Sequence, residues 1–112
     1  MRLSSGNKTV SVVVPCLNEE EAIGDVVREL LSEGADEVVV VDNGSTDRTG
    51  AVARTYGASV VVEAVKGYGR ACATGFAAIR QDADIVCFLD GDAGGCGMCA
   101  GGEGALCRVG EL

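Results

Sequence analysis

Short runs of wholly apolar residues, each followed directly by polar ones, constrain the fold of this chain more than any other feature. Val38–Val41 and Ile85–Leu89 are the clearest examples. A strand that is apolar on both faces has to be buried on both, which is typical of a parallel sheet covered by helices on each side. The second run leads straight into Asp90 and Asp92. Ligands of open α/β sheets bind beyond the carboxyl ends of the strands, so these two carboxylates are the first candidates for a functional site.

Asp90 and Asp92 have the chemistry and the spacing of metal ligands. Hard carboxylate oxygens suit Mg²⁺ or Mn²⁺, and such an ion in turn suits a diphosphate. The intervening Gly91 has no side chain, so both carboxylates can face a single ion. Most Asp-x-Asp triplets are solvated loop residues, and it is the position after a buried strand that favours a metal site here.

Strand-like and helix-like patterns alternate along the chain. Apolar runs predict four strands, and apolar residues at helical spacing predict three helices between them. This order predicts an α/β fold, a doubly wound parallel sheet assembled through right-handed crossovers. The predicted strands are Val10–Pro15, Glu37–Asp42, Ser59–Glu63 and Asp84–Asp92, and the predicted helices run from Asn18 to Gly34, from Ser45, Thr46 or Asp47 to Tyr56, and from Arg70 to Gln81.

Local signals indicate where these elements begin and end. Pro15 cannot donate to a sheet ladder and is predicted to close the first strand. Asn18 is a candidate N-cap for the first helix, and three glutamates follow it at the positive end of the helix dipole. Gly34 and Gly57 are predicted to end the first two helices. The apolar faces expected of the first and third helices are Ala22, Ile23, Val26, Val27, Leu30 and Leu31, and Ala71, Ala73, Phe76, Ala77 and Ile79.

The composition excludes several classes of protein. A chain of 112 residues allows one domain with a modest core, and a hydrophobic content of 47% excludes a disordered chain. The formal net charge of -8 argues against a nucleic-acid partner, which requires clustered lysine and arginine. The absence of histidine excludes Ser-His or Cys-His catalysis and any His-ligated metal site. No stretch approaches the ~20 apolar residues that are needed to span a bilayer.

The six cysteines do not indicate a secreted disulfide scaffold. Cys72 and Cys87 lie inside apolar patterns and are expected to be small buried side chains in a protein of the reducing cytoplasm. Residues 93–112 contain three further cysteines and seven of the 17 glycines, without any periodic apolar pattern. Zinc ligation is an alternative for these three, but the usual set of four ligands stays incomplete with Cys96, Cys99 and Cys107 alone.

Three motifs, in this order and at these spacings, resemble the family 2 glycosyltransferases of GT-A fold. They are VVVPCLNEEE at Val12–Glu21, VVVDNGSTD at Val39–Asp47 and LDGD at Leu89–Asp92. Each motif alone is common, whereas the three together are specific. The chain is most similar to the dolichyl- and polyprenyl-phosphate sugar transferases of that family. The resemblance covers about residues 10–92, and Asn43 stands where many members have a second aspartate.

The resemblance implies a fold and a set of binding residues. The fold is the Rossmann-like, nucleotide-diphospho-sugar-binding half of a GT-A transferase, a parallel sheet of strand order 3-2-1-4 flanked by helices. Asp42 is expected to read the base, and the Pro15–Glu19 turn to hold the nucleoside. Apart from the resemblance, the positive charges and backbone N–H groups of the glycine-rich segment Lys66–Arg70 are expected to lie against the diphosphate; the alternative is a flexible linker into the third helix. The expected donor-binding residues are Pro15, Asn18, Glu19, Asp42, Asn43, Lys66, Arg70 and Asp90, and the expected ligands of Mn²⁺ or Mg²⁺ are Asp90 and Asp92.

The function implied by the resemblance is transfer of a sugar from a UDP- or GDP-linked donor to an acceptor, such as a polyprenyl phosphate or another lipid phosphate. This places the protein in the cytoplasm, or peripherally at the membrane. The alternative from another class is a non-catalytic nucleotide-binding module, or a truncated remnant without transferase activity. A Rossmann dehydrogenase is disfavoured, because its G-x-G-x-x-G should follow the first strand, where the sequence reads PCLNE.

The expected organisation is a flexible N-terminus at residues 1–9, the nucleotide-sugar-binding domain at residues 10–92 and an irregular tail at residues 93–112. The tail does not match the acidic, proline-containing continuation expected of the family. The end of a fragment, or a reading-frame change near Ala93, would explain this difference. Without an acceptor-side half, the fourth strand would be an apolar edge that is liable to pair with another chain, so marginal stability and a homodimer are expected.

Overall fold

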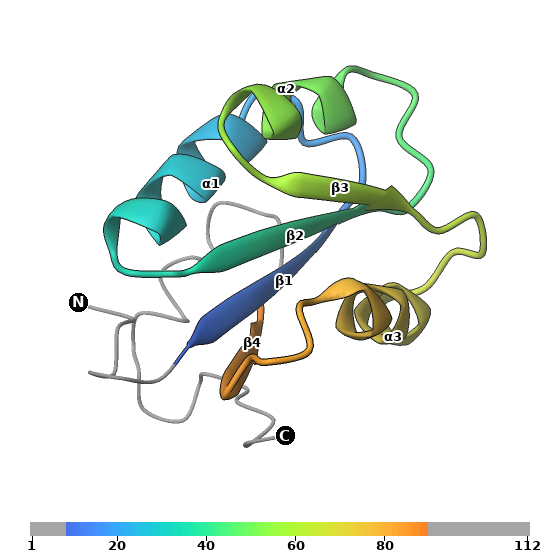
Figure 1. The fold of residues 1–112 in the computed structure, drawn as a ribbon. Coiled ribbons are helices and arrows are strands. Elements are labelled where there is room, and N and C mark those ends of the chain that lie inside the picture. The colour runs from blue at the N-terminus through green and yellow to red at the C-terminus, as the bar shows by residue number, and fades with distance from the viewer. Residues whose placement is uncertain (1–8, 90–112) are drawn as a thin grey trace.

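The computed structural model describes residues 9–89, and these form a single four-stranded sheet with helices on both faces (Figure 1). Along the chain the strands alternate with helices, as the apolar pattern predicts. The elements are β1 (Val10–Cys16), α1 (Ile23–Ser32), β2 (Glu37–Asp42), α2 (Thr49–Thr55), β3 (Ser59–Val62), α3 (Tyr68–Ala78) and β4 (Ile85–Phe88). The predictions that concern Asp90, Asp92 and the 93–112 tail lie outside the described residues.

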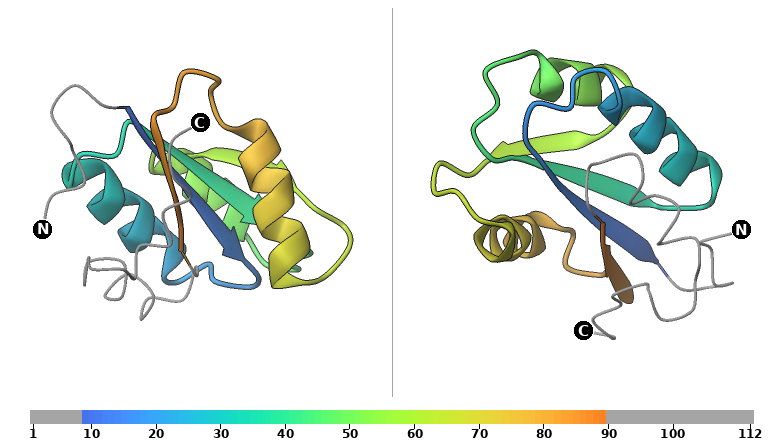
Figure 2. Two further views of the ribbon diagram at one scale, coloured as in Figure 1. Left: turned by 90° about the horizontal axis from the view of Figure 1, so that it is seen from below. Right: turned by 180° about the vertical axis from the view of Figure 1, so that it is seen from behind.

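The strand order is β3-β2-β1-β4, and every neighbouring pair is parallel. The predicted order 3-2-1-4 is therefore confirmed. In the β1–β2 ladder Val14 is opposite Val40, and in the β1–β4 ladder Val13 is opposite Phe88. Helices α1 and α2 cover one face of the sheet and α3 covers the other (Figures 1 and 2). All four carboxyl ends consequently meet at one edge, where α/β proteins bind ligands.

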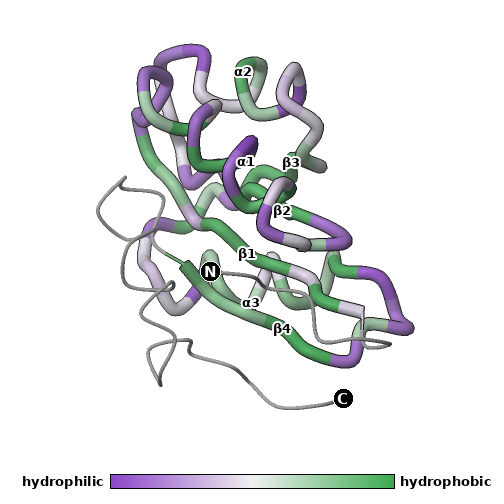
Figure 3. The backbone as a smooth tube through the Cα atoms, turned by 90° about the vertical axis from the view of Figure 1, so that its left-hand side faces the viewer, coloured by the Kyte–Doolittle hydropathy of each residue, from purple (hydrophilic) through white to green (hydrophobic). Residues whose placement is uncertain are grey.

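Alternate side chains of the two central strands enter two separate cores. A strand with helices on both faces buries every side chain, which is why its sequence is a continuous apolar run. The hydropathy colouring shows these strands as hydrophobic and most of the connecting segments as hydrophilic (Figure 3). The core under α1 and α2 contains Val12, Val14, Val38 and Val40, and the core under α3 contains Val13, Val39 and Val41.

The first helix begins later than predicted. Asn18 is not its N-cap, because its backbone has a φ of 52°, in the left-handed region, and its side chain is bonded to another loop. A turn follows, in which the backbone N–H groups of Ala22 and Ile23 donate to the Glu19 carbonyl at 3.0 and 2.8 Å. Helix α1 then runs from Ile23. The two C-terminal signals behave as expected, since Gly34 and Gly57 follow their helices with positive φ values.

Pro15 does not close the first strand, which continues to Cys16. The carbonyls of Thr9 and Val13 accept from Ile85 and Leu89, so odd-numbered residues of β1 face β4. The missing N–H of Pro15 therefore faces the β4 side, where the ladder has ended at Val13. On the other side the ladder with β2 continues undisturbed to Cys16. A proline is tolerated in a strand at such an unpaired position.

Helix α3 differs from the prediction in both its limits and its packing face. It begins at Tyr68, after Gly67 with a φ of 134°, and ends at Ala78. Ala71 and Gly75 are its buried residues, whereas Phe76 is 37% exposed. Ala73 and Ala77, also predicted to face the core, are exposed. Gly75 lets the helix backbone lie close to the sheet. The prediction was based on the spacing of apolar side chains, and glycine has none, so this packing face was missed.

The remaining boundaries shift by a few residues. Helix α2 begins at Thr49 rather than at its predicted caps, β3 ends at Val62, and β4 is the short stretch Ile85–Phe88. Cys87 is buried as predicted, whereas Cys72 is half-buried. Residues 9–89 include no helix with the length and hydropathy that a bilayer crossing requires.

Candidate functional site

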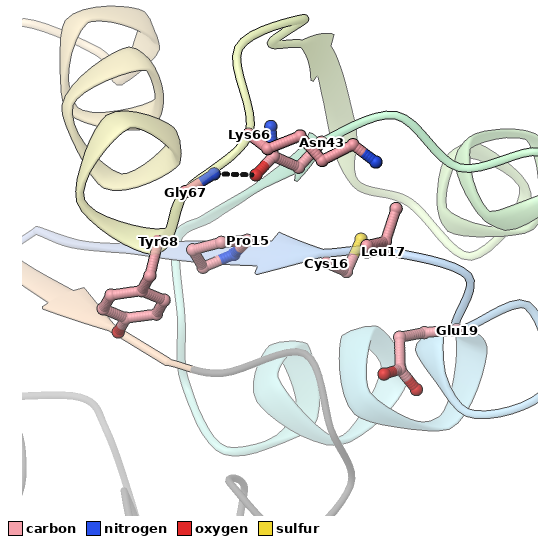
Figure 4. A pocket seen from close by; sticks show the side chains of 8 residues that line it. All are labelled: Pro15, Cys16, Leu17, Glu19, Asn43, Lys66, Gly67 and Tyr68. Carbon is pink, nitrogen blue, oxygen red and sulfur yellow. Dashed lines mark hydrogen bonds between the residues drawn. The ribbon is translucent and has the colours of Figure 1, made fainter.

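A pocket of about 390 Å³ opens at the carboxyl edge of the sheet (Figure 4). One wall comes from the end of β1 and the segment that follows it. The other wall comes from the first residue of the β2–α2 loop and from the β3–α3 connection. Figure 4 shows Glu19 and Tyr68 at opposite ends of the group, with Pro15 and Cys16 on the strand between them. The lining residues are Pro15, Cys16, Leu17, Glu19, Asn43, Lys66, Gly67 and Tyr68.

Asn18 joins the two loops that follow β1 and β2. Its backbone N–H donates to Ser45 Oγ at 2.8 Å, and its Oδ1 accepts from the backbone N–H of Thr46 at 2.8 Å. The next residue, Glu19, donates its N–H to Thr49 Oγ1 at 2.9 Å. Asparagine suits this position because it tolerates the left-handed region and its amide oxygen can accept from a neighbouring backbone. Asn18 thus fixes the shape of the pocket wall and does not line it.

Asp47 lies directly before Arg48, the N-cap position of α2, and its side chain is bonded to the first helical residue. Its Oδ1 accepts from both the backbone N–H and the hydroxyl of Thr49, and its Oδ2 accepts from the N–H of Glu20 at 3.3 Å. The hydrogen bond from the Thr49 hydroxyl is the main reason why the pKa of Asp47 is lowered, and the two backbone donors act in the same direction. Asp47 was one of three predicted caps of the second helix; the N-cap position is Arg48, but the Asp47 carboxylate does accept from the first N–H of the helix.

Asp42 ends β2 beside the pocket. Its Oδ1 accepts from the backbone N–H of Ser45 at 2.8 Å, and its backbone carbonyl accepts from the N–H of Glu63 at 3.0 Å. The side chain is half-buried. It is not among the residues that line the pocket, although the next residue, Asn43, is.

Asn43 is 8% exposed and makes three hydrogen bonds through its side-chain amide. Nδ2 donates to the carbonyls of Glu63 and Val65 at 2.7 and 2.9 Å, and Oδ1 accepts from the N–H of Gly67 at 3.1 Å. The last of these bonds is drawn in Figure 4. The side-chain amide of Asn43 therefore links the end of β2 to the β3–α3 connection.

The structure separates the two predicted cations. Lys66 lines the pocket, and its Cε and Nζ would both lie 3.3 Å from a Cβ placed on Gly44, so the side chain extends over the β2–α2 turn. Arg70 lies in α3 with its Nε 3.6 Å from Oε2 of Glu63, and its side chain is 60% exposed. Arg70 is not among the residues that line the pocket.

Cys16 lies in the pocket wall and is chemically inert. Its thiol is buried, and burial, with the nearby carboxylates of Asp42, Glu19 and Asp47, raises its pKa to about 12. It therefore stays protonated at neutral pH, and the reactive form of a cysteine is the thiolate.

The predicted site omitted four of the residues that line the pocket. Cys16 and Leu17 belong to the first sequence motif, and Gly67 and Tyr68 to the glycine-rich loop, so the position of each in a motif was the available signal. Leu17 and Tyr68 are 40% and 54% exposed. An exposed aromatic ring and an exposed leucine beside a cavity can contact a flat ligand.

Within residues 9–89 no three histidine, cysteine or acidic side chains are grouped as metal ligands would be. The predicted ligands Asp90 and Asp92 lie just beyond this range. The last described residue, Leu89, donates its N–H to the Val13 carbonyl at 2.9 Å, so the chain reaches the carboxyl edge of the sheet at this point. This is the edge that carries the pocket.

Comparison with known proteins gives consistent results. The profile of "Glycosyl transferase family 2" matches residues 11–93. An uncharacterised glycosyltransferase of Mycobacterium tuberculosis (strain H37Rv) is 45% identical over 83 residues, which cover 74% of this chain and 36% of that protein. Glucosyl-3-phosphoglycerate synthase of Mycolicibacterium smegmatis is 39% identical over 103 residues, which cover 82% of this chain and 33% of that protein.

A solved structure agrees in both fold and sequence. It is the glucosyl-3-phosphoglycerate synthase of Mycobacterium tuberculosis in complex with Mn²⁺, UDP-glucose and phosphoglyceric acid. The TM-score is 0.65 at 38% identity, and the match covers 78% of this chain and 34% of that chain. A further crystal structure of that enzyme contains Mg²⁺ and UDP. The chain spans about a third of the length of these relatives.

Proposed function

The chain belongs to glycosyl transferase family 2, and on that premise we propose that it binds a nucleotide-diphosphate sugar with a divalent cation and transfers the sugar to an acceptor. The observation that carries this proposal is the pocket at the carboxyl edge of the sheet. Its walls are formed by the first motif, from Pro15 to Glu19, and by the loop that contains Lys66. These segments are far apart in the sequence and both were expected to contact the donor.

The nucleoside part of the donor is proposed to lie against the Pro15–Glu19 wall, with Asp42 reading the base. A carboxylate can accept from the imide N–H of uracil or from the N–H groups of guanine. Between these two, UDP is the better candidate, because the solved relative at 38% identity binds UDP-glucose. Tyr68 and Leu17 supply exposed apolar surface at the same cavity.

The diphosphate is proposed to lie between Lys66 and the cation held by Asp90 and Asp92. Lys66 supplies a positive charge at the pocket, whereas Arg70 is paired with Glu63 and takes a smaller part. Mn²⁺ or Mg²⁺ would be held by hard carboxylate oxygens and would offset the charge that develops on the departing nucleoside diphosphate. Both ions occur in crystal structures of the solved relative.

The acceptor is proposed to be a small molecule or lipid that carries a phosphate group. A polyprenyl phosphate follows from the sequence resemblance, and phosphoglyceric acid, which the solved relative binds, offers a phosphate without the lipid. The lipid acceptor would place the protein peripherally at the cytoplasmic face of a membrane, and the small acceptor would not. The alternative remains a nucleotide-binding module without transferase activity.

The first experiment is a thermal-stability screen of the 112-residue chain. It uses UDP, GDP and their glucose and mannose conjugates, each with and without Mn²⁺. A ligand that binds only the folded state raises the melting temperature by mass action, with a stabilisation of ~2.7 kcal/mol at a hundredfold excess over its dissociation constant. We expect the largest shift with a uridine nucleotide and Mn²⁺ together.

Two matched variants separate site binding from a general ion effect. Asp92→Ala should lose the metal-dependent part of the shift, whereas Asp82→Ala, at an exposed residue paired with Arg80, should keep it. A folded sample that shows no shift with any nucleotide and metal pair would refute donor binding. A shift without any sugar transfer to phosphoglycerate or a short polyprenyl phosphate would favour the non-catalytic module.

A further inference from the structure

The β3–α3 segment, residues 63–67, lacks regular secondary structure but is held by hydrogen bonds along its whole length. The N–H of Glu63 donates to the Asp42 carbonyl at 3.0 Å. The N–H of Val65 donates to Oε2 of Glu63 at 2.8 Å. Three further bonds, to the carbonyls of Glu63 and Val65 and from the N–H of Gly67, come from one side chain, that of Asn43. A surface connection held in this way keeps one shape, although it has no helix or strand to support it.

The side chain of Asn43 bridges two carbonyls and one N–H across this segment. An amide nitrogen has two hydrogens, and both are used, one for Glu63 and one for Val65. The amide oxygen accepts from Gly67. Turning the amide over would place its oxygen against two carbonyl oxygens and its NH₂ against an N–H, so the chemistry allows one orientation only.

Asparagine alone among residues of this size can make this set of bonds. An aspartate has the same shape, but its carboxylate has no hydrogen to donate, and it would place a negative charge 2.7 to 2.9 Å from two carbonyl oxygens. The site is nearly closed to solvent, since Asn43 is 8% exposed. Only the N–H of Gly67 would still bond to this charge, and a buried charge with so few partners is costly. The choice of Asn over Asp at position 43 is therefore a consequence of the three bonds.

The residues held by these bonds are the ones that form the pocket wall. Lys66 lies between Val65 and Gly67, both of which are bonded to Asn43, and Tyr68 follows directly. Gly67 has a φ of 134°, a conformation open to glycine, and a Cβ there would meet nothing within 4 Å. No side chain packs around the α-carbon of Gly67, so the shape of this turn depends on hydrogen bonds, and those to Asn43 are the ones that flank Lys66 on both sides.

We propose that Asn43 is a positioning residue that holds Lys66 in place for the donor, rather than a residue that contacts the donor itself. This inference rests on the proposed function, because Lys66 is taken to meet the diphosphate. Asn43 acts through Lys66, so its contribution to binding should exist only while Lys66 carries its charge.

The test is a double-mutant cycle on the affinity of the folded chain for UDP with Mn²⁺, measured by calorimetry. Asn43→Asp should weaken binding about tenfold, as expected when two hydrogen bonds near a charged group are lost. In a Lys66→Met background the same change should cost less than about twofold, because coupled residues do not contribute additively. The matched control is Gln81→Glu, the same exchange of an amide for a carboxylate at an exposed residue beyond α3. It should leave the affinity unchanged.

Each outcome of the cycle has a defined meaning. Wild-type affinity in folded Asn43→Asp, or an equal loss in both backgrounds, would overturn the inference while leaving the proposed function intact. A wild-type chain that binds no nucleotide would overturn both together. If Asn43→Asp does not fold, Asn43→Ser removes the bonds without adding a charge, and the same cycle with Lys66→Met decides the question by the same criteria. A purely structural role would lower the melting temperature without changing the affinity of the folded fraction.

Discussion

Glu63 connects the end of β3 to α3 through its carboxylate. One oxygen accepts from the Thr74 hydroxyl, and the other accepts from the N–H of Val65 and lies 3.6 Å from Nε of Arg70. The hydrogen bond from Thr74 is the main reason why the pKa of Glu63 is lowered, and the backbone of Val65 and the charge of Arg70 act in the same direction. The ionised form of Glu63 is thus favoured by the folded state.

This shift predicts how the stability of the chain depends on pH. A carboxyl group whose folded pKa lies below its unfolded value, ~4.3 for glutamate, stabilises the fold above that value. The stabilisation is lost as the pH falls through the folded pKa. Glu63→Gln should therefore lower the melting temperature at pH 7, and the difference from wild type should shrink below about pH 4. Thermal denaturation followed by circular dichroism at pH 7 and pH 3 measures both effects.

The control for this prediction is the same substitution at the exposed Glu21. It should change the melting temperature less than Glu63→Gln does at pH 7. A loss at Glu63 that stays equal at pH 7 and pH 3 would show that the charge of the carboxylate contributes nothing.

Helix α3 packs against the sheet through a glycine. A Cβ placed on Gly75 would lie 2.3 Å from Cγ1 of Val13 and 2.8 Å from Cγ2 of Val41. These valines belong to the buried face of β1 and β2, so they cannot move aside without disturbing the core. The closeness of α3 to the sheet, and with it the position of the pocket wall at Tyr68, depends on the missing side chain.

We expect Gly75→Ala to destabilise the fold by about 1–3 kcal/mol, the usual cost of overpacking a close contact. The matched change is Gly69→Ala in the same helix, where a Cβ would meet nothing within 4 Å. That variant should be unchanged or more stable by up to about 1 kcal/mol, because alanine favours helix. Urea denaturation of the two variants beside wild type gives both values, and equal effects would contradict the packing argument.

At the scale of the whole molecule, the sheet has two edges in the described part of the chain. Strand β3 has β2 on one side, and β4 has β1 on one side. In β4 the N–H groups of Ile85 and Leu89 donate to β1, so the N–H of Phe88 points away from it. Outward N–H groups on an apolar edge are a site where a second copy can pair. We therefore propose a homodimer through β4.

Sedimentation over a range of concentrations tests this proposal. The wild type should associate as its concentration rises, and Phe88→Pro, which removes one outward N–H, should stay monomeric at concentrations where the wild type is a dimer. Phe88→Leu is the control. It also removes the aromatic ring, whose centroid lies 6.5 Å from that of the Phe76 ring, but it keeps the backbone N–H. A wild type that sediments as a monomer at every concentration would refute the dimer.

The sequence by itself determined the class of fold, the order of the elements and the two loops that meet at the pocket. The continuous valine runs of β1 and β2 are typical of strands buried on both faces, and this pattern is local enough to be read from consecutive residues. The motif at Pro15–Glu19 was assigned to a donor site through its resemblance to family 2 glycosyltransferases, and the loop at Lys66 through its glycines and positive charge; both segments line the pocket.

Only the tertiary structure decided what the polar side chains near the pocket do. Asn18 was predicted to cap a helix, but its bonds go to residues 27 and 28 positions away. Asn43 was predicted to bind substrate, and the structure shows in addition that its side chain is bonded to partners 20 to 24 positions away in the β3–α3 segment. Gly75 has no side chain to read, and its importance comes from two valines on other elements. Hydrogen bonds and close contacts between distant segments depend on how the elements are placed, whereas apolar periodicity depends on neighbouring residues alone.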